Sequence, residues 1–239
     1  MTILITGASG DIGAAIAREF ASSEPPGSLT MVLAGCRNVL SLNALGRELA
    51  ARNVSVRTAL GNIGEERFAA SLFEGLTELD LLVNCAGSSH YGLLQDMTAA
   101  EWDQVMDANL KGAFLCCRGA IPLMLQKHSG RIINISSIQG RTGASMEAAY
   151  AASKAGLDGL TLSLAKELAP SGITVNALAP GMVSTKMNAH LSPEELEELR
   201  QEIPAGRFTT PEEVAVAVKK LYEMPSYVTG QILEMGGGW

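Results

Sequence analysis

Short apolar runs alternate along this chain with longer segments in which apolar residues recur every three or four positions. Apolar runs of about four to eight residues between turn signals are typical of buried strands, and the longer period is typical of helices packed on one side. Strands are expected over 3–6, 29–34, 55–60, 79–83, 131–136, 173–178 and 231–235. Helices are expected over 12–22, 39–52, 65–76, 99–126 with a kink at Pro122, 148–168 and 211–222.

This alternation predicts a single α/β domain over 1–239, with a Rossmann-type, doubly wound parallel sheet of about seven strands and helices on both faces. The sequence contains no internal repeat, low-complexity tract or domain linker. Ligands bind such sheets beyond the carboxyl ends of the strands. Motifs at Gly7, Asn84, Ser137 and Pro180 each follow an expected strand, so we expect them to share one site.

Composition excludes several classes of protein. The chain carries a net charge of −7 and has a pI near 5.1. It has no basic stripe for nucleic acid, and no apolar run approaches the roughly 18 residues that span a bilayer. The N-terminus enters a strand without a signal-peptide pattern, and the four cysteines and three histidines lack metal-ligand spacing. The sequence therefore predicts a cytoplasmic protein without a metal, whose cysteines are small buried hydrophobes.

A glycine-rich turn joins the first strand to the first helix, at Gly7-Ala8-Ser9-Gly10-Asp11-Ile12-Gly13. Glycines at such a turn let the backbone approach a pyrophosphate, whose charge then meets the free N–H groups of a helix N-terminus. The alternative is a tight turn that binds no ligand. The position of this turn, directly after the first strand of the chain, favours phosphate binding.

Tyr150 and Lys154 lie four residues apart in an Ala-rich segment without proline, which predicts a helix carrying both on one face. A free tyrosine holds its proton to a pH of about 10, and a neighbouring cation is expected to lower that pKa. The tyrosine could then donate and accept a proton near neutral pH. Ser137 follows the strand over 131–136, and Asn109 lies further upstream. Each residue alone is more often structural, so the interpretation as a site depends on their combination.

Together these motifs resemble those of the short-chain dehydrogenase/reductase family over essentially the whole chain. The resemblance includes the glycine-rich turn, Asn84-Cys85-Ala86-Gly87 after the fourth strand, and Pro180-Gly181 before the nicotinamide-binding Thr185. Asn109, Ser137, Tyr150 and Lys154 match the family's catalytic tetrad in order and spacing. The resemblance implies a nicotinamide cofactor bound by Gly7, Ser9, Gly10, Asp11, Ile12, Gly13, Arg37, Asn62, Ile63, Asn84, Ala86, Gly87, Tyr150, Lys154, Pro180, Gly181, Val183 and Thr185.

Two positions depart from the family pattern. Asp11 stands where the family usually has glycine, and Asp tolerates unusual backbone angles better than most residues. Asn62 stands where the family often has an aspartate against the adenine amine, and its amide oxygen can accept the same hydrogen bond. Both changes leave the geometry of the adenosine pocket open.

The identity of the nicotinamide depends on the end of the second strand. An acidic residue there would hydrogen-bond the ribose 2′-hydroxyl and repel a 2′-phosphate. The chain has Gly35-Cys36-Arg37-Asn38 at this point, with no acid. Arg37 favours NADP over NAD, since it can form a charge-assisted bond with the phosphate. The alternative for Arg37 is a solvated loop residue.

The resemblance implies reversible hydride transfer between nicotinamide and a carbonyl carbon. Ser137 would hydrogen-bond the carbonyl oxygen, and Tyr150 would deliver the proton. Lys154 would lower the pKa of Tyr150 and hold the nicotinamide ribose. Asn109 would interrupt its helix and hold a water that links Lys154 to solvent. The resemblance also implies a homotetramer built on the helices 99–126 and 148–168.

The segment 184–207 lies between the nicotinamide loop and the next helix, so it is expected to form a lid over the substrate. It looks like the corresponding part of bacterial 3-oxoacyl-[acyl-carrier-protein] reductases, including its ending Ile203-Pro204-Ala205-Gly206-Arg207. This favours reduction of a 3-oxoacyl thioester with NADPH, and acyl carrier protein becomes a candidate partner.

The charges near the expected lid point away from a carrier protein, which is acidic and needs a basic docking patch. His128 and Ser171 stand where these reductases often carry arginines, and the lid holds Glu194, Glu195, Glu197 and Glu198. The alternative substrates are therefore a CoA ester, a free ketone or a sugar-like alcohol. A nucleotide-binding module without turnover and a role in assembly alone are also open, although non-catalytic relatives commonly lose the tyrosine or lysine that this chain keeps.

Overall fold

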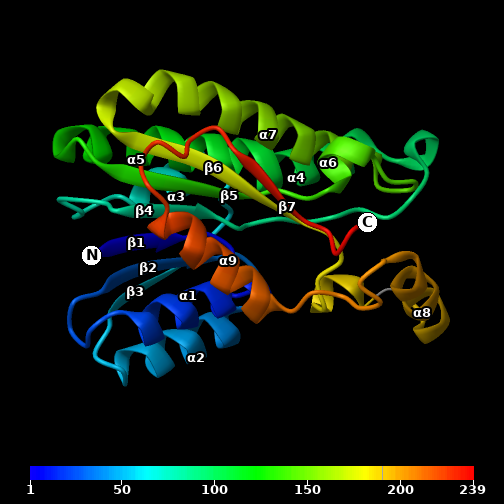
Figure 1. The fold of residues 1–239 in the computed structure, drawn as a ribbon, viewed down its shortest axis with the longest axis horizontal. Coiled ribbons are helices and arrows are strands. Elements are labelled where there is room, and N and C mark those ends of the chain that lie inside the picture. Colours follow the sequence, from blue (N-terminus) through cyan, green and yellow to red (C-terminus); the bar gives the residue numbers. More distant parts are fainter. Residues whose placement is uncertain (190) are drawn as a thin grey trace.

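Seven parallel strands form one sheet in the computed structural model, which describes residues 1–189 and 191–239 (Figure 1). The spatial order is β3-β2-β1-β4-β5-β6-β7, so the chain begins near the middle of the sheet and winds outward in both directions. This arrangement confirms the predicted doubly wound α/β fold. The strands are β1 (Thr2–Ile5), β2 (Thr30–Gly35), β3 (Ser55–Leu60), β4 (Leu81–Asn84), β5 (Gly130–Ile135), β6 (Ile173–Pro180) and β7 (Ile232–Met235).

Helices cover both faces of the sheet (Figure 1). One face carries α1 (Asp11–Ser23), α2 (Val39–Ala50) and α9 (Pro211–Glu223). The other face carries α3 (Glu66–Ser71), α4 (Ala99–Met106), α5 (Gly112–Lys127) and α7 (Ala148–Leu168). The shorter elements are η1 (Leu94–Asp96), η2 (Asp107–Lys111), α6 (Gln139–Thr142), η3 (Ala169–Ser171), η4 (Lys186–Asn188) and α8 (Pro193–Glu202).

Strand β1 shows why the apolar runs of the sequence are continuous. All four of its residues are buried. Ile3 and Ile5 pack with Ile16 and Phe20 of α1, whereas Leu4 belongs to the hydrophobic cluster on the opposite face. Successive side chains of a strand point to opposite faces, so a sheet covered on both sides needs apolar residues at every position.

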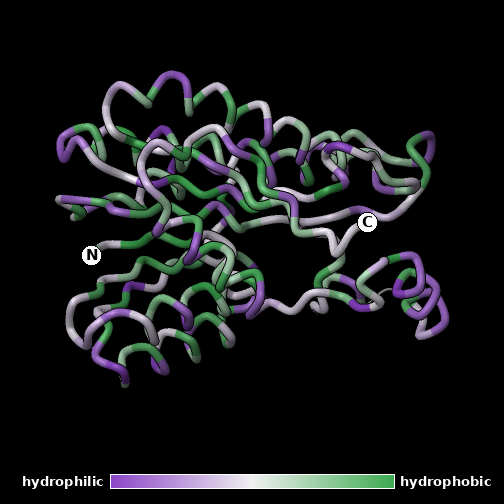
Figure 2. The backbone as a smooth tube through the Cα atoms, in the orientation of Figure 1, coloured by the Kyte–Doolittle hydropathy of each residue, from purple (hydrophilic) through white to green (hydrophobic). Residues whose placement is uncertain are grey.

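The hydrophobic residues concentrate in the strands and on the inner sides of the long helices, whereas α8 is mainly hydrophilic (Figure 2). None of the residues of α8 is buried. Helix α8 starts at Pro193 after the capping residue Ser192. Across residues 1–189 and 191–239, no helix combines the length and the apolar character needed to cross a bilayer.

The helix expected over 99–126 forms as α4 and α5, joined by the π-helical turn η2 at Asn109, and Pro122 lies inside α5. Other predicted boundaries are wrong. The helix expected over 65–76 ends at Ser71, and the chain then turns through Gly75, whose φ of 74° suits glycine. Strand β6 continues to Pro180, two residues beyond its expected end at 178, and brings the Pro-Gly motif to the sheet edge.

A buried chain of polar side chains connects β4, β5 and α7. The amide Nδ2 of Asn84 donates to Oδ1 of Asn134 at 2.8 Å, and Nδ2 of Asn134 donates to the hydroxyl of Thr161 at 2.8 Å. The Thr161 hydroxyl donates in turn to the carbonyl oxygen of Leu157 at 2.8 Å. Asn134 and Thr161 are fully buried. Removing one partner of such a bond leaves a buried polar group unpaired, which costs free energy of folding.

Replacing the middle of this chain should therefore destabilise the fold. We expect Asn134→Leu to lower the free energy of unfolding by about 2–3 kcal/mol, because it leaves the buried Asn84 amide without its oxygen acceptor. Urea denaturation of the variant would measure this change. Asn43→Leu on the exposed surface of α2 is the matched control, with an expected change within about 0.5 kcal/mol. Equal stability of the two variants would show that the polar chain contributes nothing.

Candidate active site

A cleft of about 1560 Å³ opens beyond the carboxyl ends of β1, β4, β5 and β6. This is the edge at which ligands bind to doubly wound sheets. The structure brings all the predicted site residues to the lining of this cleft except Asn84 and Asn109. Motifs that lie far apart in the sequence therefore share one cavity, as the strand order requires.

The glycine-rich turn approaches the loop after β4 closely. Gly7 has a φ of 69°, and a Cβ atom there would lie 2.7 Å from the carbonyl oxygen of Cys85. A Cβ atom on Gly13 would lie 2.5 Å from the carbonyl oxygen of Gly7. The hydroxyl of Thr6 accepts hydrogen bonds from the N–H groups of Cys85 and Ala86 at 3.0 and 3.1 Å. Glycine is therefore required for the shape of the turn itself.

Helix α1 presents its N-terminus to the cleft. Gly10 is its N-cap and forms no side-chain cap, and Gly10 through Gly13 line the cavity. The first N–H groups of a helix attract anions. Asp11 complicates this picture, because its Oδ2 accepts a hydrogen bond from the backbone N–H of Lys186 at 2.8 Å. The carboxylate thus ties the first turn of α1 to η4, and it places a negative charge beside the expected phosphate site.

Arg37, Asn62 and Ile63 lie at the end of the cleft formed by the loops after β2 and β3. Arg37 and Asn62 are exposed, whereas Ile63 is buried. The Oδ1 atom of Asn62 accepts a hydrogen bond from the N–H of Gly64 at 3.0 Å. An amide oxygen has two lone pairs, so this local bond leaves Asn62 with capacity to accept another.

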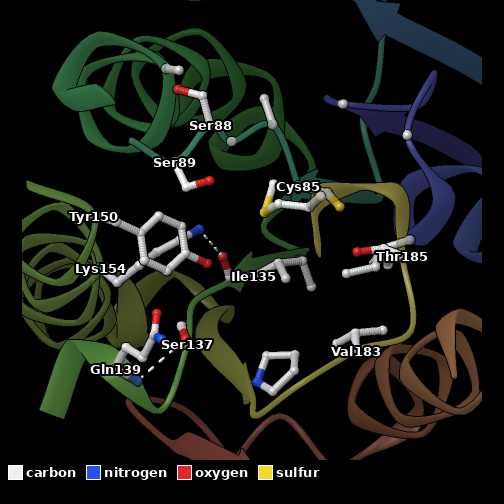
Figure 3. Close-up of a pocket in the computed structure, with 18 of the residues that line it drawn as sticks. Cys85, Ser88, Ser89, Ile135, Ser137, Gln139, Tyr150, Lys154, Val183 and Thr185 are labelled. Atoms are coloured by element: carbon white, nitrogen blue, oxygen red, sulfur yellow. Dashed lines mark hydrogen bonds between the residues drawn. The ribbon is translucent and has the colours of Figure 1, made fainter. Parts of the chain in front are cut away.

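Ser137, Tyr150 and Lys154 lie together at the other end of the cleft (Figure 3). The ammonium of Lys154 is 5.5 Å from the centre of the Tyr150 ring and donates to the carbonyl oxygen of Ile135 at 2.8 Å. Lys154 is only 4% exposed. Burial lowers the pKa of this lysine to about 8, although the carboxylate of Asp158 opposes the change.

The expectation that Lys154 lowers the pKa of Tyr150 is wrong for this structure. Burial raises the pKa of Tyr150 to about 12, a hydrogen bond with Ser137 opposes that rise, and the charge of Glu147 adds to it. The physical reason is that the buried ammonium donates to a backbone carbonyl, while the phenol of Tyr150 lies half-buried in the wall of the cleft. Tyr150 therefore holds its proton at neutral pH.

Asn109 interrupts its helix as predicted, within the π-helical turn η2. Its amide uses three partners: Oδ1 accepts from the N–H of Ser88 at 2.8 Å, and Nδ2 donates to the Ser88 carbonyl at 3.0 Å and to the Ser153 hydroxyl at 2.9 Å. These bonds hold η2 against α7 and the loop after β4. Asn109 lies behind Gly87, where an added Cβ would be 3.4 Å from its Oδ1 and 3.8 Å from Nζ of Lys154.

Asn84 does not reach the cleft with its side chain. It is 4% exposed and bonds to Asn134 within the core, so its position at the end of β4 serves the buried polar chain. Its neighbours Ala86 and Gly87 do line the cavity, as predicted.

Sequence reasoning missed several residues of the cleft. Gln139 and Glu147 line it and bond to each other, with Nε2 of Gln139 donating to Oε2 of Glu147 at 3.0 Å. Their closeness in sequence to Ser137 and Tyr150 was the available signal. Trp239 also lines the cleft, and no local motif marks it. In the described part of the chain, no three His, Cys, Asp or Glu side chains are grouped to hold a metal ion.

Comparison with known proteins decides the family. A family model described as short chain dehydrogenase matches residues 1–196. The chain belongs to the short chain dehydrogenase family. It is 39% identical over 241 residues to "3-oxoacyl-[acyl-carrier-protein] reductase FabG" of Aquifex aeolicus, covering 98% of this chain and 95% of that protein. The proteins of the same name from Rickettsia bellii and Staphylococcus aureus are 42% and 40% identical, over 99% and 98% of this chain and 95% and 96% of theirs.

Membership of the short chain dehydrogenase family makes this chain an oxidoreductase that uses a nicotinamide cofactor. The residues present fit such a group. The turn at Gly7 and Gly13 has no room for side chains, and the uncapped start of α1 offers free N–H groups to a diphosphate. A tyrosine beside a buried lysine lies at the other end of the same cleft.

The buried Lys154 gives a stability prediction that depends on pH. Its folded pKa of about 8 lies below the ordinary 10.5, so the unfolded chain binds more protons between those values and wild-type stability rises with pH there. Below pH 8, burying the ammonium destabilises the fold by roughly 3 kcal/mol. Lys154→Met removes this destabilisation. We therefore expect the free energy of unfolding of wild type to rise by about 2 kcal/mol relative to that of the variant between pH 7 and pH 9.5.

Urea denaturation at the two pH values would measure that gain. Lys166→Met on the exposed side of α7 serves as the control and should show no such change. A stability difference between wild type and Lys154→Met that stays constant with pH would contradict the buried ammonium.

Proposed function

We propose that this enzyme reduces 3-oxoacyl thioesters to 3-hydroxyacyl thioesters with NADPH. The observation that carries the proposal is the convergence of Ser137, Tyr150 and Lys154 at one end of a cleft whose other end holds Arg37. Relatives named 3-oxoacyl-[acyl-carrier-protein] reductase, about 40% identical over nearly the whole chain, support this choice of substrate.

The catalytic roles follow from the chemistry of the side chains. The bound nicotinamide supplies the hydride. Ser137 donates a hydrogen bond to the substrate carbonyl oxygen, where negative charge develops, and Tyr150 delivers the proton to that oxygen. The raised pKa of Tyr150 keeps it in the protonated form that reduction needs. Lys154 holds positive charge beside the phenol, and Asn109 positions Ser88 and α7 around it.

We assign the cofactor to the residues at the strand ends. The N–H groups at the start of α1 hold the diphosphate, and Asn62 and Ile63 hold the adenine. Exposed Arg37 follows β2 without a neighbouring acid, which supports NADPH over NADH because a guanidinium pairs well with a 2′-phosphate. Ala86, Gly87, Pro180, Gly181, Val183 and Thr185 line the cleft between these groups and Tyr150.

The segment 184–207 acts in this proposal as the lid of a single domain over 1–239. Met187, Leu191, Leu199 and Glu202 from this segment line the cleft, while α8 itself is largely exposed. The hydrogen bond from the N–H of Lys186 to Asp11 fixes the base of the lid to the glycine-rich turn.

The charges around the lid give little support for strong docking of acyl carrier protein. In the described part of the lid, Arg200 pairs with Glu197, and Arg207, its last residue, pairs with Glu213. Lys127 is occupied by Glu78 and Asp80. In the described part of the cleft lining, the cations outside ion pairs are Arg37, Lys154 and Lys186. They form no extended basic patch for an acidic protein, so we infer weak docking of acyl carrier protein.

We also infer a cytoplasmic homotetramer. Exposed apolar side chains on α5 and α7, among them Phe114, Leu125 and Leu162, support pairing of these helices between subunits. The four cysteines are free thiols, which suits a reducing compartment.

Removing the phenolic hydroxyl should abolish turnover. We expect Tyr150→Phe to lower kcat for acetoacetyl-CoA by at least about a hundredfold, the usual contribution of a positioned proton donor. Stopped-flow absorbance of NADPH would measure the rate, and fluorescence titration would check that the cofactor still binds. Near-normal turnover with normal cofactor binding would show that another group donates the proton.

The cofactor preference should depend on Arg37. We expect wild type to turn over acetoacetyl-CoA with NADPH far faster than with NADH. Arg37→Ala should raise the KM for NADPH by about tenfold or more, since it removes a charge-assisted hydrogen bond, and leave that for NADH unchanged. Arg67→Ala on the exposed surface of α3 is the control. Equal efficiency of wild type with both cofactors would overturn the assignment to NADPH.

A further inference from the structure

Gln139 and Glu147 form a polar pair beside the catalytic groups. The backbone N–H of Gln139 donates to the Ser137 hydroxyl at 3.3 Å, and the Gln139 side chain lies next to Ser137 below the Tyr150 ring (Figure 3). Nε2 of Gln139 donates to Oε2 of Glu147 at 3.0 Å. Both side chains are partly exposed and line the cleft. The pair therefore lies within reach of a group next to the reacting carbonyl.

The backbone holds Glu147 in an unusual way. Its neighbour Met146 adopts a φ of 63°, a left-handed conformation that is uncommon for a residue with a long side chain. The carbonyl oxygen of Met146 accepts a hydrogen bond from the N–H of Gly92 at 2.8 Å, which ties this strained turn to the loop after β4. Strained conformations persist where the surrounding structure fixes them, and they concentrate at functional sites. The strain places Glu147 directly before the start of α7.

The carboxylate of Glu147 has no cation to neutralise it. Among residues 1–189 and 191–239, no lysine, arginine or histidine forms an ion pair with it. An ionised carboxylate only accepts hydrogen bonds, and the amide oxygen of Gln139 is also an acceptor. An alkyl chain placed against this pair would displace water from the acceptors without supplying donors, which is unfavourable.

We propose that Gln139 and Glu147 form a subsite for a hydroxyl group on the carbon next to the carbonyl, and that the enzyme interconverts α-hydroxy ketones and vicinal diols. The reacting carbonyl oxygen faces the donors Ser137 and Tyr150, while the adjacent hydroxyl donates to Glu147. This activity shares the catalytic groups of the proposed function but does not depend on its acyl thioester substrate.

The chemistry of the step is balanced. The reduced nicotinamide transfers a hydride to the carbonyl carbon, so a C–H bond forms and the carbon–oxygen π bond breaks. Tyr150 transfers its proton to the carbonyl oxygen, and a proton from solvent restores the phenol. The ketone gains two electrons and the cofactor loses two. The neighbouring hydroxyl is unchanged throughout and serves only to orient the substrate.

Two ketones of the same shape test the subsite. Hydroxyacetone and butanone differ only by a hydroxyl in place of a methyl group, and each is offered to the whole enzyme with NADPH. We expect kcat/KM for hydroxyacetone to exceed that for butanone by at least about tenfold, the effect of one hydrogen bond to a charged acceptor. A ratio near one, or no turnover of hydroxyacetone, would overturn the proposal.

Variants connect the preference to the pair. Glu147→Leu keeps the approximate size of the side chain and removes its acceptors, so the ratio of the two ketones should fall toward one. Glu147→Gln retains one acceptor oxygen and should give an intermediate ratio. Glu74→Leu on an exposed turn is the control for loss of an acidic residue and should keep the wild-type ratio. If the ratio survives in Glu147→Leu, another group recognises the hydroxyl.

Acetoacetyl-CoA separates the two proposals. Selective turnover of hydroxyacetone without turnover of acetoacetyl-CoA would reject the acyl thioester function and keep the hydroxyl subsite. Turnover of acetoacetyl-CoA with equal kcat/KM values for hydroxyacetone and butanone would keep the acyl thioester function and reject the hydroxyl subsite. Circular dichroism of each variant checks that it is folded. If Glu147→Leu is not folded, the intermediate ratio expected of Glu147→Gln tests the same contact.

Discussion

The site depends on one charge held out of water. The ammonium of Lys154 is buried and donates to the carbonyl oxygen of Ile135, the last residue of β5. A buried cation is tolerated only where it has such a partner, so this contact fixes the position of α7 against the sheet. Ser137 follows Ile135 by two residues, and Tyr150 lies one turn before Lys154. This contact between a helix and a strand end therefore aligns both hydroxyls. Burying the charge lowers the stability of the fold, and the contact maintains a geometry that neither element would hold alone.

The parallel sheet brings the remaining parts together. Thr6, directly after β1, accepts hydrogen bonds from two residues that follow β4, so these bonds hold the glycine-rich turn against the loop after β4. Asn109 performs a similar task behind the cleft, where one amide joins three separate segments. The polar residues that carry no expected chemistry, such as Asn134 and Thr161, keep the strands and α7 in register beneath the site. The side chains of the candidate site thus lie on the cleft side of the strand ends, and the residues that hold the packing lie in the core beneath them.

The strongest local patterns predicted the fold and the place of the site. The alternation of strands and helices indicated the sheet, and the glycines around Gly7 indicated a close backbone approach that the structure contains. The failures concern properties set by distant residues. The interruption at Asn109 was expected only from the family resemblance, because the π-helical turn depends on contacts with Ser88 and Ser153 that local propensity does not describe. The pKa of Tyr150 was inferred from one neighbour, whereas burial by the whole cleft determines its direction. Asn84 occupies the expected position, yet the direction of its side chain depends on the polar chain in the core.

The hydrogen bond between Asp11 and the backbone N–H of Lys186 joins the start of α1 to the first residues of the proposed lid. A diphosphate arriving at α1 meets the carboxylate that makes this bond, and like charges repel. A bound diphosphate would therefore lie beside the same carboxylate that holds the backbone of Lys186. A residue that departs from the family pattern thus joins the glycine-rich turn to the loop at 186–188.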